Sequence, residues 1–453
     1  MPQKLKKELT LFTATLYGVG IILGAGIYVL IGQGAAIAGN AVWLSFIFSA
    51  ILAIFTGLSY AELSGMFQKD AAEYVYTNKA FKKPPIAFAV QWIMLFAIIV
   101  SATAVAVGFG SYFSALFNFQ SVSILGAEIP ASIPVAAALL LAMSILNYIG
   151  IRESTKYNIV STLIESSGLI IIIAIGALFF GKTSIDYFSS PAGIPSILSA
   201  AALIFFAYIG FEDLVNFSEE TKNARKTIPR ALVLSIIIST ILYILVSIAS
   251  ITVIGSDALA SSKAPLSSVM DAAFPNTGFI LSIIALFATS NTVLALLIVA
   301  SRMLYGLGCN KILPSVCAKV GKNGTPYISI IVVMFLSLAA LLLGGIKSIA
   351  SLTDIGIFTV YIFVNSALIF LRYRLPNAPR TFRSPINIGK FPVLALLGIL
   401  SSILMLFHFE FSIMVYEIVI IAVGIIFYLS MKKAGKISSS LHWGRKKALK
   451  HIP

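Results

Sequence analysis

The sequence predicts an all-α polytopic membrane protein with twelve transmembrane helices. Of its 453 residues, 59% are hydrophobic and only 11% are charged, and the mean hydropathy is +0.99, far above that of an ordinary water-soluble domain. Apolar runs long enough to cross the ~30 Å hydrocarbon layer of a lipid bilayer recur along the chain, separated by polar loops. The helices are expected at about 9–38, 41–66, 85–118, 129–150, 156–181, 194–218, 230–255, 277–308, 326–345, 349–372, 391–408 and 411–431.

The distribution of charge gives the orientation. With an even number of spans both termini lie on one side, and 29 of the 32 Lys and Arg residues lie there too. Only Lys182, Lys263 and Lys347 lie on the opposite side. Because Lys and Arg accumulate on the cytoplasmic side, both termini are expected in the cytoplasm of a multi-pass protein of the cell (plasma) membrane. The net charge of +15 is then a signal of topology, and a nucleic-acid partner is excluded.

The first expected helix is interrupted by Gly24-Ala25-Gly26. A break inside hydrocarbon leaves backbone polar groups unpaired, at a cost of several kcal/mol each, unless they line a cavity or bind something. The two glycines let the chain bend and let a ligand approach. The half-helix that begins near Ile27 directs its N–H groups and positive dipole end at the gap, which suits a carboxylate. The alternative is a patch of small residues for close helix packing.

The sixth expected helix is interrupted at 209–213, Ile-Gly-Phe-Glu-Asp. The half-helix that ends near Tyr208 would expose the carbonyl groups of Phe206, Ala207 and Ile209, which suit an ammonium group. Together the two breaks offer partners to both ends of a zwitterion, as in the midplane substrate sites of secondary transporters.

The breaks lie five spans apart, so the second helix enters the membrane from the opposite side. This spacing predicts two repeats of inverted orientation, at 9–181 and 194–372, with two additional helices at 391–431. All of them belong to one transmembrane domain over 1–431, followed by a basic cytoplasmic tail at 432–453. The connection at 71–83 has a helical spacing of aromatic residues and is expected to form a short interfacial helix.

Three carboxylic acids stand out inside the apolar segments. Glu165 lies about one third of the way along the fifth helix, where an ionisable group is costly and points to function. Burial favours its neutral form, so it is a candidate proton carrier; the alternative is a structural hydrogen bond to a neighbouring helix. Glu212 and Asp213 follow the second break. One of them faces the pocket, to select a cationic side chain or to titrate, or they cap the half-helix that begins there.

Other residues give weaker signals. Cys309 and Cys317 fall in a cytoplasmic loop and are expected to be reduced thiols with no functional role. The three histidines lie at or beyond the last helices, and no nucleotide-binding or hydrolase motif is present. The sequence therefore predicts no enzyme, no cofactor and no metal site. A channel is disfavoured, because no repeated pore motif accompanies the broken helices.

Several motifs resemble those of the amino acid–polyamine–organocation (APC) superfamily of transporters. They are Gly-Ala-Gly-Ile-Tyr at 24–28, Ser-Tyr-Ala-Glu-Leu at 59–63, Phe-Phe-Ala-Tyr-Ile-Gly-Phe-Glu-Asp at 205–213, and the charged segment 219–230 that follows. The resemblance implies an amino acid permease with the LeuT-like five-plus-five inverted repeat and alternating access. The chain departs from the family where Gln68 and Ala71-Ala72 replace the usual Pro and Gly-Gly.

The resemblance also implies the residues of the site. Backbone contacts to the substrate α-amino and carboxylate groups correspond to Ile22, Gly24, Ala25 and Gly26. The helix 6 contacts correspond to Phe206, Ala207 and Ile209, with Phe206 as an aromatic lid, and Phe211 and Glu212 complete this side. Ser101 and Asn291 fall near side-chain pocket positions. Some proton-coupled relatives carry a lysine where this chain has Glu165.

The main expectation is a secondary active amino acid transporter coupled to protons, with Glu165 and Glu212 as the residues for coupling. The alternative is an exchanger or facilitator of cationic amino acids or polyamines that uses Glu212 as a counter-charge without proton coupling. The transported side chain, the choice between symport and antiport, and the oligomeric state are left open.

Overall fold

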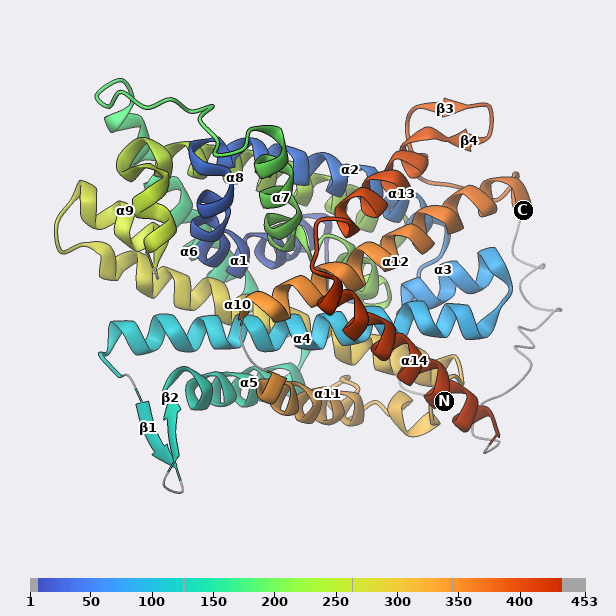
Figure 1. The fold of residues 1–453 in the computed structure, drawn as a ribbon. Helices are drawn as coiled ribbons and strands as arrows, with labels where there is room; N and C mark the ends of the chain where they lie inside the picture. Colours follow the sequence, from blue (N-terminus) through green and yellow to red (C-terminus); the bar gives the residue numbers. More distant parts are fainter. Residues whose placement is uncertain (1–6, 120, 125–126, 263, 344–345, 434–453) are drawn as a thin grey trace.

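The computed structural model describes residues 7–433, except 120, 125–126, 263 and 344–345, and it is built almost entirely of α-helices (Figure 1). Within these described residues, ten segments are long and apolar enough to cross a membrane. Two further apolar helices, at Tyr327–Ala340 and Val393–Leu406, have 14 residues each. They coincide with two of the twelve expected spans, and at about 1.5 Å per residue each covers about 21 Å.

The elements run in chain order as follows. The helices are α1 (Leu11–Ala38), α2 (Val42–Met66), α3 (Ala72–Phe81), α4 (Pro84–Leu116), α5 (Ser132–Ile149), α6 (Ile151–Phe179), α7 (Ile194–Ile204), α8 (Ala224–Ser261), α9 (Pro265–Ala273), α10 (Gly278–Cys309), α11 (Tyr327–Ala340), α12 (Ile346–Arg374), α13 (Val393–Leu406) and α14 (Phe411–Lys433). The 3-10 segments are η1 (Gly39–Ala41), η2 (Phe205–Tyr208), η3 (Glu212–Glu220), η4 (Ser315–Ala318) and η5 (Leu341–Leu343). Two antiparallel hairpins pair β1 (Ser121–Ile124) with β2 (Ala127–Pro130), and β3 (Asn387–Ile388) with β4 (Phe391–Pro392).

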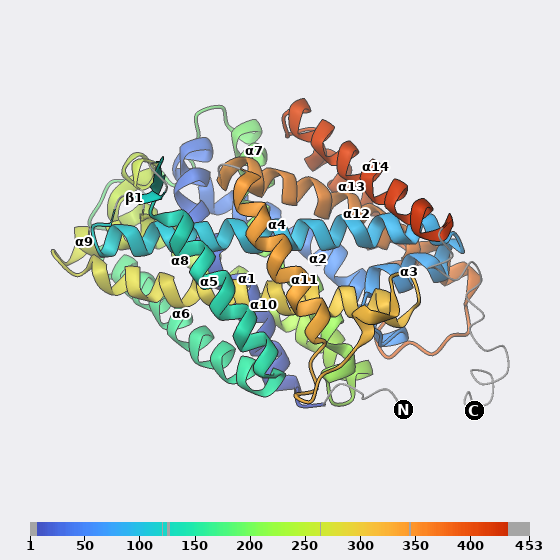
Figure 2. The same ribbon diagram turned by 90° about the horizontal axis from the view of Figure 1, so that it is seen from below.

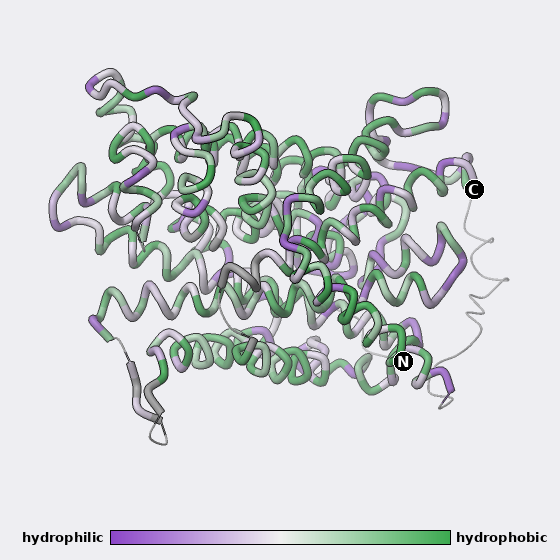
Figure 3. The backbone as a smooth tube through the Cα atoms, viewed as in Figure 1, coloured by the Kyte–Doolittle hydropathy of each residue, from purple (hydrophilic) through white to green (hydrophobic). Residues whose placement is uncertain are grey.

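Helix α1 lies in the middle of the bundle, in contact with α6, α7, α8 and α10. Helix α4 packs on α5, α10 and α12. The hairpin β1–β2 and α9 lie at one end of the molecule, and α3 and the last turns of α14 lie at the other (Figures 1 and 2). Hydrophilic residues gather in loops and at helix ends (Figure 3). Helix α14 exposes a series of large aliphatic side chains, as a helix facing lipid does.

Both expected breaks occur in the backbone. Within α1, Gly24 has the non-helical angles φ −21° and ψ −124°. Helix α7 ends at Ile204, continues as η2, and stops at Ile209, whose ψ is 137°. Gly210 then has φ +117°, a value that side chains with a Cβ rarely adopt, before η3 begins. The second half-helix is thus a 3-10 segment rather than a regular α-helix.

The connection after α2 forms a helix, as expected, but it is not a surface helix. In α3 the side chains of Tyr74, Tyr76 and Ala80 are buried, and the helix packs against α4 and α12. The residue before it, Ala71, has the left-handed φ of +55°. Most of the expected basic tail, from residue 434 on, lies outside the described residues.

Candidate functional site

The two breaks touch each other. Gly26 lies so close to η2 that a Cβ atom built on it would be 2.3 Å from the Cα atom of Ala207. A Cβ atom on Gly210 would be 2.1 Å from Cγ2 of Ile21. A Cβ atom at either position would collide with these neighbouring atoms, so both glycines are needed for the contact. The breaks of α1 and of the α7–η3 segment therefore form one continuous region in the middle of the bundle.

A tyrosine from α8 joins the two breaks. The hydroxyl group of Tyr243 donates a hydrogen bond to the carbonyl oxygen of Ala207 at 2.8 Å, and it also contacts the carbonyl oxygen of Ile22. These carbonyl groups are released where the helices are interrupted, and unpaired they would be costly in a buried place. The Ala207 carbonyl, expected to face a substrate ammonium group, is thus engaged by a phenol in this state. Sequence reasoning missed Tyr243, although a tyrosine in the middle of a long apolar helix is a detectable signal.

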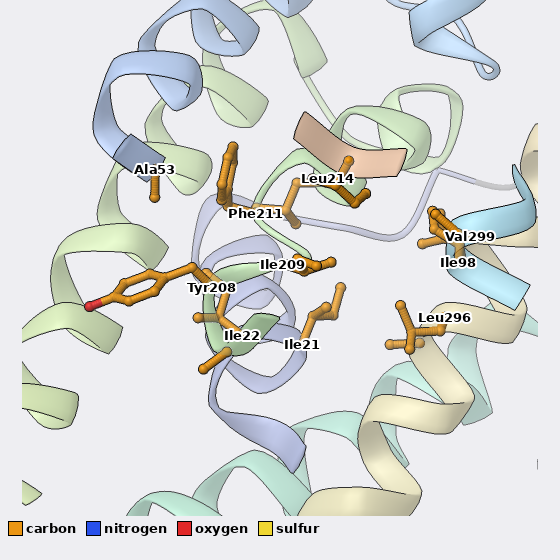
Figure 4. Close-up of a cluster of buried hydrophobic side chains, with 14 of the residues drawn as sticks. Ile21, Ile22, Ala53, Ile98, Tyr208, Ile209, Phe211, Leu214, Leu296 and Val299 are labelled. Atoms are coloured by element: carbon orange, nitrogen blue, oxygen red, sulfur yellow. The ribbon is translucent and has the colours of Figure 1, made fainter. Parts of the chain in front are cut away.

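Beside the breaks lies an apolar wall contributed by α4 and α10. Ile98, Leu296 and Val299 lie opposite Ile21 and Ile209 (Figure 4), and all five side chains are buried. The wall is aliphatic and carries no charge. It is the surface that would meet the side chain of a ligand whose backbone binds at the breaks.

The other expected contact residues lie around this region. Gly24 packs on α10, where a Cβ atom would be 1.5 Å from Oγ1 of Thr292. Phe206 is half-buried, and Ser101 is buried on α4. Phe211 is buried and packs edge-on against Tyr60. The side chain of Ala25 lies outside the described set.

Glu165 belongs to a separate buried polar cluster between α6 and α10. Its Oε1 lies 3.5 Å from Nδ2 of Asn291, which also donates to Oγ1 of Thr162 at 3.3 Å. Asn158 donates to Oδ1 of Asn291 at 2.8 Å. The structure thus places Asn291 with Glu165. Within the described part of the chain, Oε2 of Glu165 has no hydrogen-bond partner.

This cluster lies directly against α1, one turn before its break. A Cβ atom on Gly20 would be 2.1 Å from Oγ1 of Thr162 and 2.8 Å from Nδ2 of Asn291. Tyr28, just after the break, donates to the backbone carbonyl of Glu165 at 2.8 Å. Both halves of α1 therefore contact the helix segment that carries Glu165, so a change in its charge would act on the break.

The acidic residues after the second break are both completely buried. Oε2 of Glu212 accepts a hydrogen bond from the N–H group of Gly210 at 3.2 Å, so Glu212 pairs a backbone group at the break, although no side chain caps η3 itself. Neither carboxylate oxygen of Asp213 has a hydrogen-bond partner among the residues that the structure describes. Among the same residues, both carboxylate oxygens of Asp354 in α12 also have no hydrogen-bond partner.

Three sets of ion pairs join the elements at the end of the molecule where α3 lies. Arg302 of α10 binds Glu220 at 3.1 Å, with both side chains buried. Arg372 and Arg380 both bind Glu62, at 2.5 and 2.9 Å. The more exposed pair is Lys69 with Glu219, at 3.1 Å. The sets are, in full, Arg302–Glu220, Glu62 with Arg372 and Arg380, and Lys69–Glu219.

The chain that precedes α1 is bonded to the end of η3. The N–H groups of Glu8 and Leu9 donate to the carbonyl oxygen of Glu220 at 2.9 and 3.1 Å. The N–H group of Lys222 donates to the carbonyl oxygen of Leu9 at 2.8 Å. Leu9 and Thr221 form an isolated parallel bridge. The two broken elements are therefore connected at their ends as well as at their breaks.

No cluster of three His, Cys, Asp or Glu side chains within the described ranges is arranged to hold a metal ion. Cys309 and Cys317 are both free thiols. The chemistry available at the breaks is therefore that of backbone carbonyl and N–H groups, aliphatic side chains and buried carboxylates.

A polytopic helical bundle with two touching helix breaks and buried carboxylates beside them defines a membrane transporter. The chain belongs to the amino acid permease family, whose model matches residues 9–431. It is 29% identical over 457 residues to the branched-chain amino acid permease BcaP of Bacillus subtilis (strain 168), covering 96% of this chain and 95% of the relative. It is 28% identical to the methylthioribose transporter of the same organism, covering 84% and 85%. It is also 28% identical to cationic amino acid transporter 4 of Mus musculus, covering 84% of this chain and 62% of the relative.

Proposed function

We propose that this chain is a secondary active amino acid transporter that binds the substrate at the two touching breaks and works by alternating access. The contact of Gly26 with Ala207 is the observation that carries the proposal. It brings the N-terminal end of the second half of α1 close to the carbonyl end of η2. The first suits the substrate carboxylate and the second its ammonium group.

The substrate class follows from the wall beside the breaks. Ile98, Leu296 and Val299 would surround the substrate side chain with aliphatic groups. Such a surface binds a branched or otherwise apolar side chain, because burying apolar area is favourable and burying an unpaired charge is costly. The relative named as a branched-chain amino acid permease supports the same class.

Coupling to protons is assigned to Glu165, with Glu212 as a second group. Glu165 is completely buried, has one carboxylate oxygen without a described partner, and lies on the α6 segment that both halves of α1 contact. A carboxyl group in this position binds a proton readily and changes its charge when the surrounding helices move.

The proposal includes the membrane arrangement. Twelve spans would consist of inverted repeats at 9–181 and 194–372 and two further helices at 391–431. Both termini would lie in the cytoplasm and the protein in the plasma membrane. The positions of the basic residues and the occurrence of one break in each half support this arrangement.

The test is uptake into proteoliposomes that contain the purified protein. Labelled leucine, lysine and spermidine would be compared with and without an imposed pH gradient, and a thermal-shift screen would rank their binding. We expect leucine to stabilise the protein and to accumulate only with the gradient. Uptake of lysine or spermidine in preference to leucine, by exchange that ignores the gradient, would contradict the proposal.

That outcome would support the second candidate, an exchanger or facilitator of cationic amino acids or polyamines. The resemblance to a cationic amino acid transporter and the buried carboxylate of Glu212 next to the break favour it. In this case Glu212 would act as the counter-charge of the substrate.

A further inference from the structure

A second group of buried acids lies next to the second break, where the start of α3 meets η3 and the N–H group of Ala72 donates to Oδ1 of Asn216 at 3.3 Å. Glu73 of α3, Glu212 and Asp213 are all completely buried. They are close enough for Glu212 and Glu73 to repel the charge of Asp213. The sequence did not predict Glu73 as a site residue, because the segment 71–83 that contains α3 was expected to lie at the membrane surface.

The surroundings of these acids supply hydroxyl groups but no cation. The hydroxyl group of Tyr60 in α2 donates to Oε1 of Glu73 at 3.3 Å. Gln91 of α4 and Tyr76 of α3 lie beside Glu73, and Tyr361 of α12 lies beside Glu212 and Asp213. Among the described residues, the four other side chains that face the acids, from α2, α3, α4 and α12, thus include no Lys or Arg: they are Tyr60, Tyr76, Tyr361 and Gln91.

Several polar atoms in this group have no partner. Both carboxylate oxygens of Asp213, Oε2 of Glu73 and the hydroxyl group of Tyr76 are buried without a hydrogen bond to any described residue. Three buried carboxylates cannot all remain charged without compensation, because each unpaired buried charge costs several kcal/mol. They must bind either protons or a metal cation.

The geometry favours protons. A cation such as Na⁺ or Ca²⁺ needs several oxygen ligands gathered around one point. Within the described chain, no three acidic side chains converge in this way. A proton needs only one oxygen, and it turns a carboxylate into a donor that pairs with a neighbouring carboxylate.

We propose that Glu73, Glu212 and Asp213 form a proton-binding site, distinct from Glu165, at the junction of α3 and η3. The site holds protons while α3 covers η3, and it releases them when the two elements separate and water enters. Burial raises the pKa of Glu73 to about 7, so its proton exchanges within the physiological range. This inference rests on the proposed transport function and extends it to the α3 side of the second break.

The test measures exchange of labelled substrate in proteoliposomes with the same pH on both sides, so that no gradient contributes. The variants are Glu73→Gln and Asp213→Asn, which keep the shape of the side chain. Asp354→Asn is the matched control, because Asp354 is equally buried and equally unpaired but lies in α12, apart from the group. Infrared spectra of the purified proteins between pH 5 and 9 would measure the protonated carboxyl groups directly.

We expect wild-type exchange to change around pH 7, and Glu73→Gln or Asp213→Asn to move this midpoint by about one pH unit or abolish it. Asp354→Asn should follow the wild-type curve, and Glu73→Gln should remove one titrating carboxyl band. Unchanged midpoints and an unchanged infrared titration in both variants would overturn the inference, as would a midpoint set by sodium concentration. Failure of the wild type to transport any amino acid would instead count against the proposed function, while the infrared titration would still decide the inference.

Discussion

Gly26 of α1 and Ala207 of η2 are in direct backbone contact: a single added Cβ atom would lie 2.3 Å from the Cα atom of Ala207. The two residues are separated by 181 positions in the sequence, yet they join the two helix breaks. The contact depends on the absence of a side chain on one partner, which makes it simple to test.

Gly26→Ala should push the two breaks apart. Forcing one extra methyl group into a packed interior costs about 1–3 kcal/mol, and we expect the initial rate of amino acid uptake to fall more than tenfold. Gly321→Ala is the control, because its added Cβ atom would meet only ordinary contacts, at 3.5 Å or more. Equal uptake by both variants would mean that the contact has no role in transport.

Tyr243→Phe should leave the carbonyl groups of Ile22 and Ala207 without their donor. An unsatisfied buried acceptor costs about 1–3 kcal/mol, so the melting temperature in detergent should fall. If the substrate ammonium group binds the same carbonyl groups, saturating substrate will restore part of this loss and stabilise the variant more than the wild type. Tyr187→Phe, which removes a hydroxyl group bonded to Thr252, should show no such gain.

Glu165→Gln should separate binding from coupling. The variant keeps an oxygen that accepts from Asn291, but it cannot change its charge. We expect the thermal shift caused by substrate to persist and accumulation driven by a pH gradient to be lost. Full accumulation by the variant would assign the coupling proton elsewhere.

The ion pairs should differ in their contribution to stability. Glu220→Gln leaves Arg302 buried and charged without its partner, and we expect a loss of about 3–5 kcal/mol. Lys69→Ala removes a partly exposed pair with Glu219, which contributes about 0–1 kcal/mol. Melting curves of the two variants at the same pH would check the difference, and similar losses would contradict it.

Glu73 should make stability depend on pH. Its pKa rises from 4.5 to about 7 on folding because the side chain is buried. The neutral form is therefore favoured in the folded protein, so this contribution is complete below about pH 4.5 and is lost as the pH rises through 7. The shift corresponds to about 3 kcal/mol. In Glu73→Gln the melting temperature should decline less over this range than in the wild type.

The helix breaks could be predicted because their signals are local. Glycine at 24, 26 and 210 and the acidic pair after the second break all lie within a few residues of the interruption. The sequence left open whether the acids face the pocket or cap the half-helix that begins there; η3 has no side-chain cap, and Glu212 instead accepts from the N–H group of Gly210 before it.

The partners of the breaks could not be predicted, because they come from distant parts of the chain. Tyr243 reaches the carbonyl of Ile22 across 221 positions. Glu73 is buried only because α3 packs inside the bundle. The spacing of the aromatic residues in α3 had instead predicted a helix at the membrane surface. A periodic pattern reports that a helix has an apolar face, but not whether lipid or protein covers it.

The pairing of Leu9 with Thr221 has a mechanical consequence. Backbone bonds at this bridge, and the contact of Ile21 with Gly210, fix the first half of α1 and the segment η3 to each other at both of their ends. Independent motion would require breaking three backbone hydrogen bonds, worth about 0.5–1.5 kcal/mol each. We therefore expect the two segments to move together, so that access from the α3 end of the molecule would depend on one coordinated rotation instead of two separate ones.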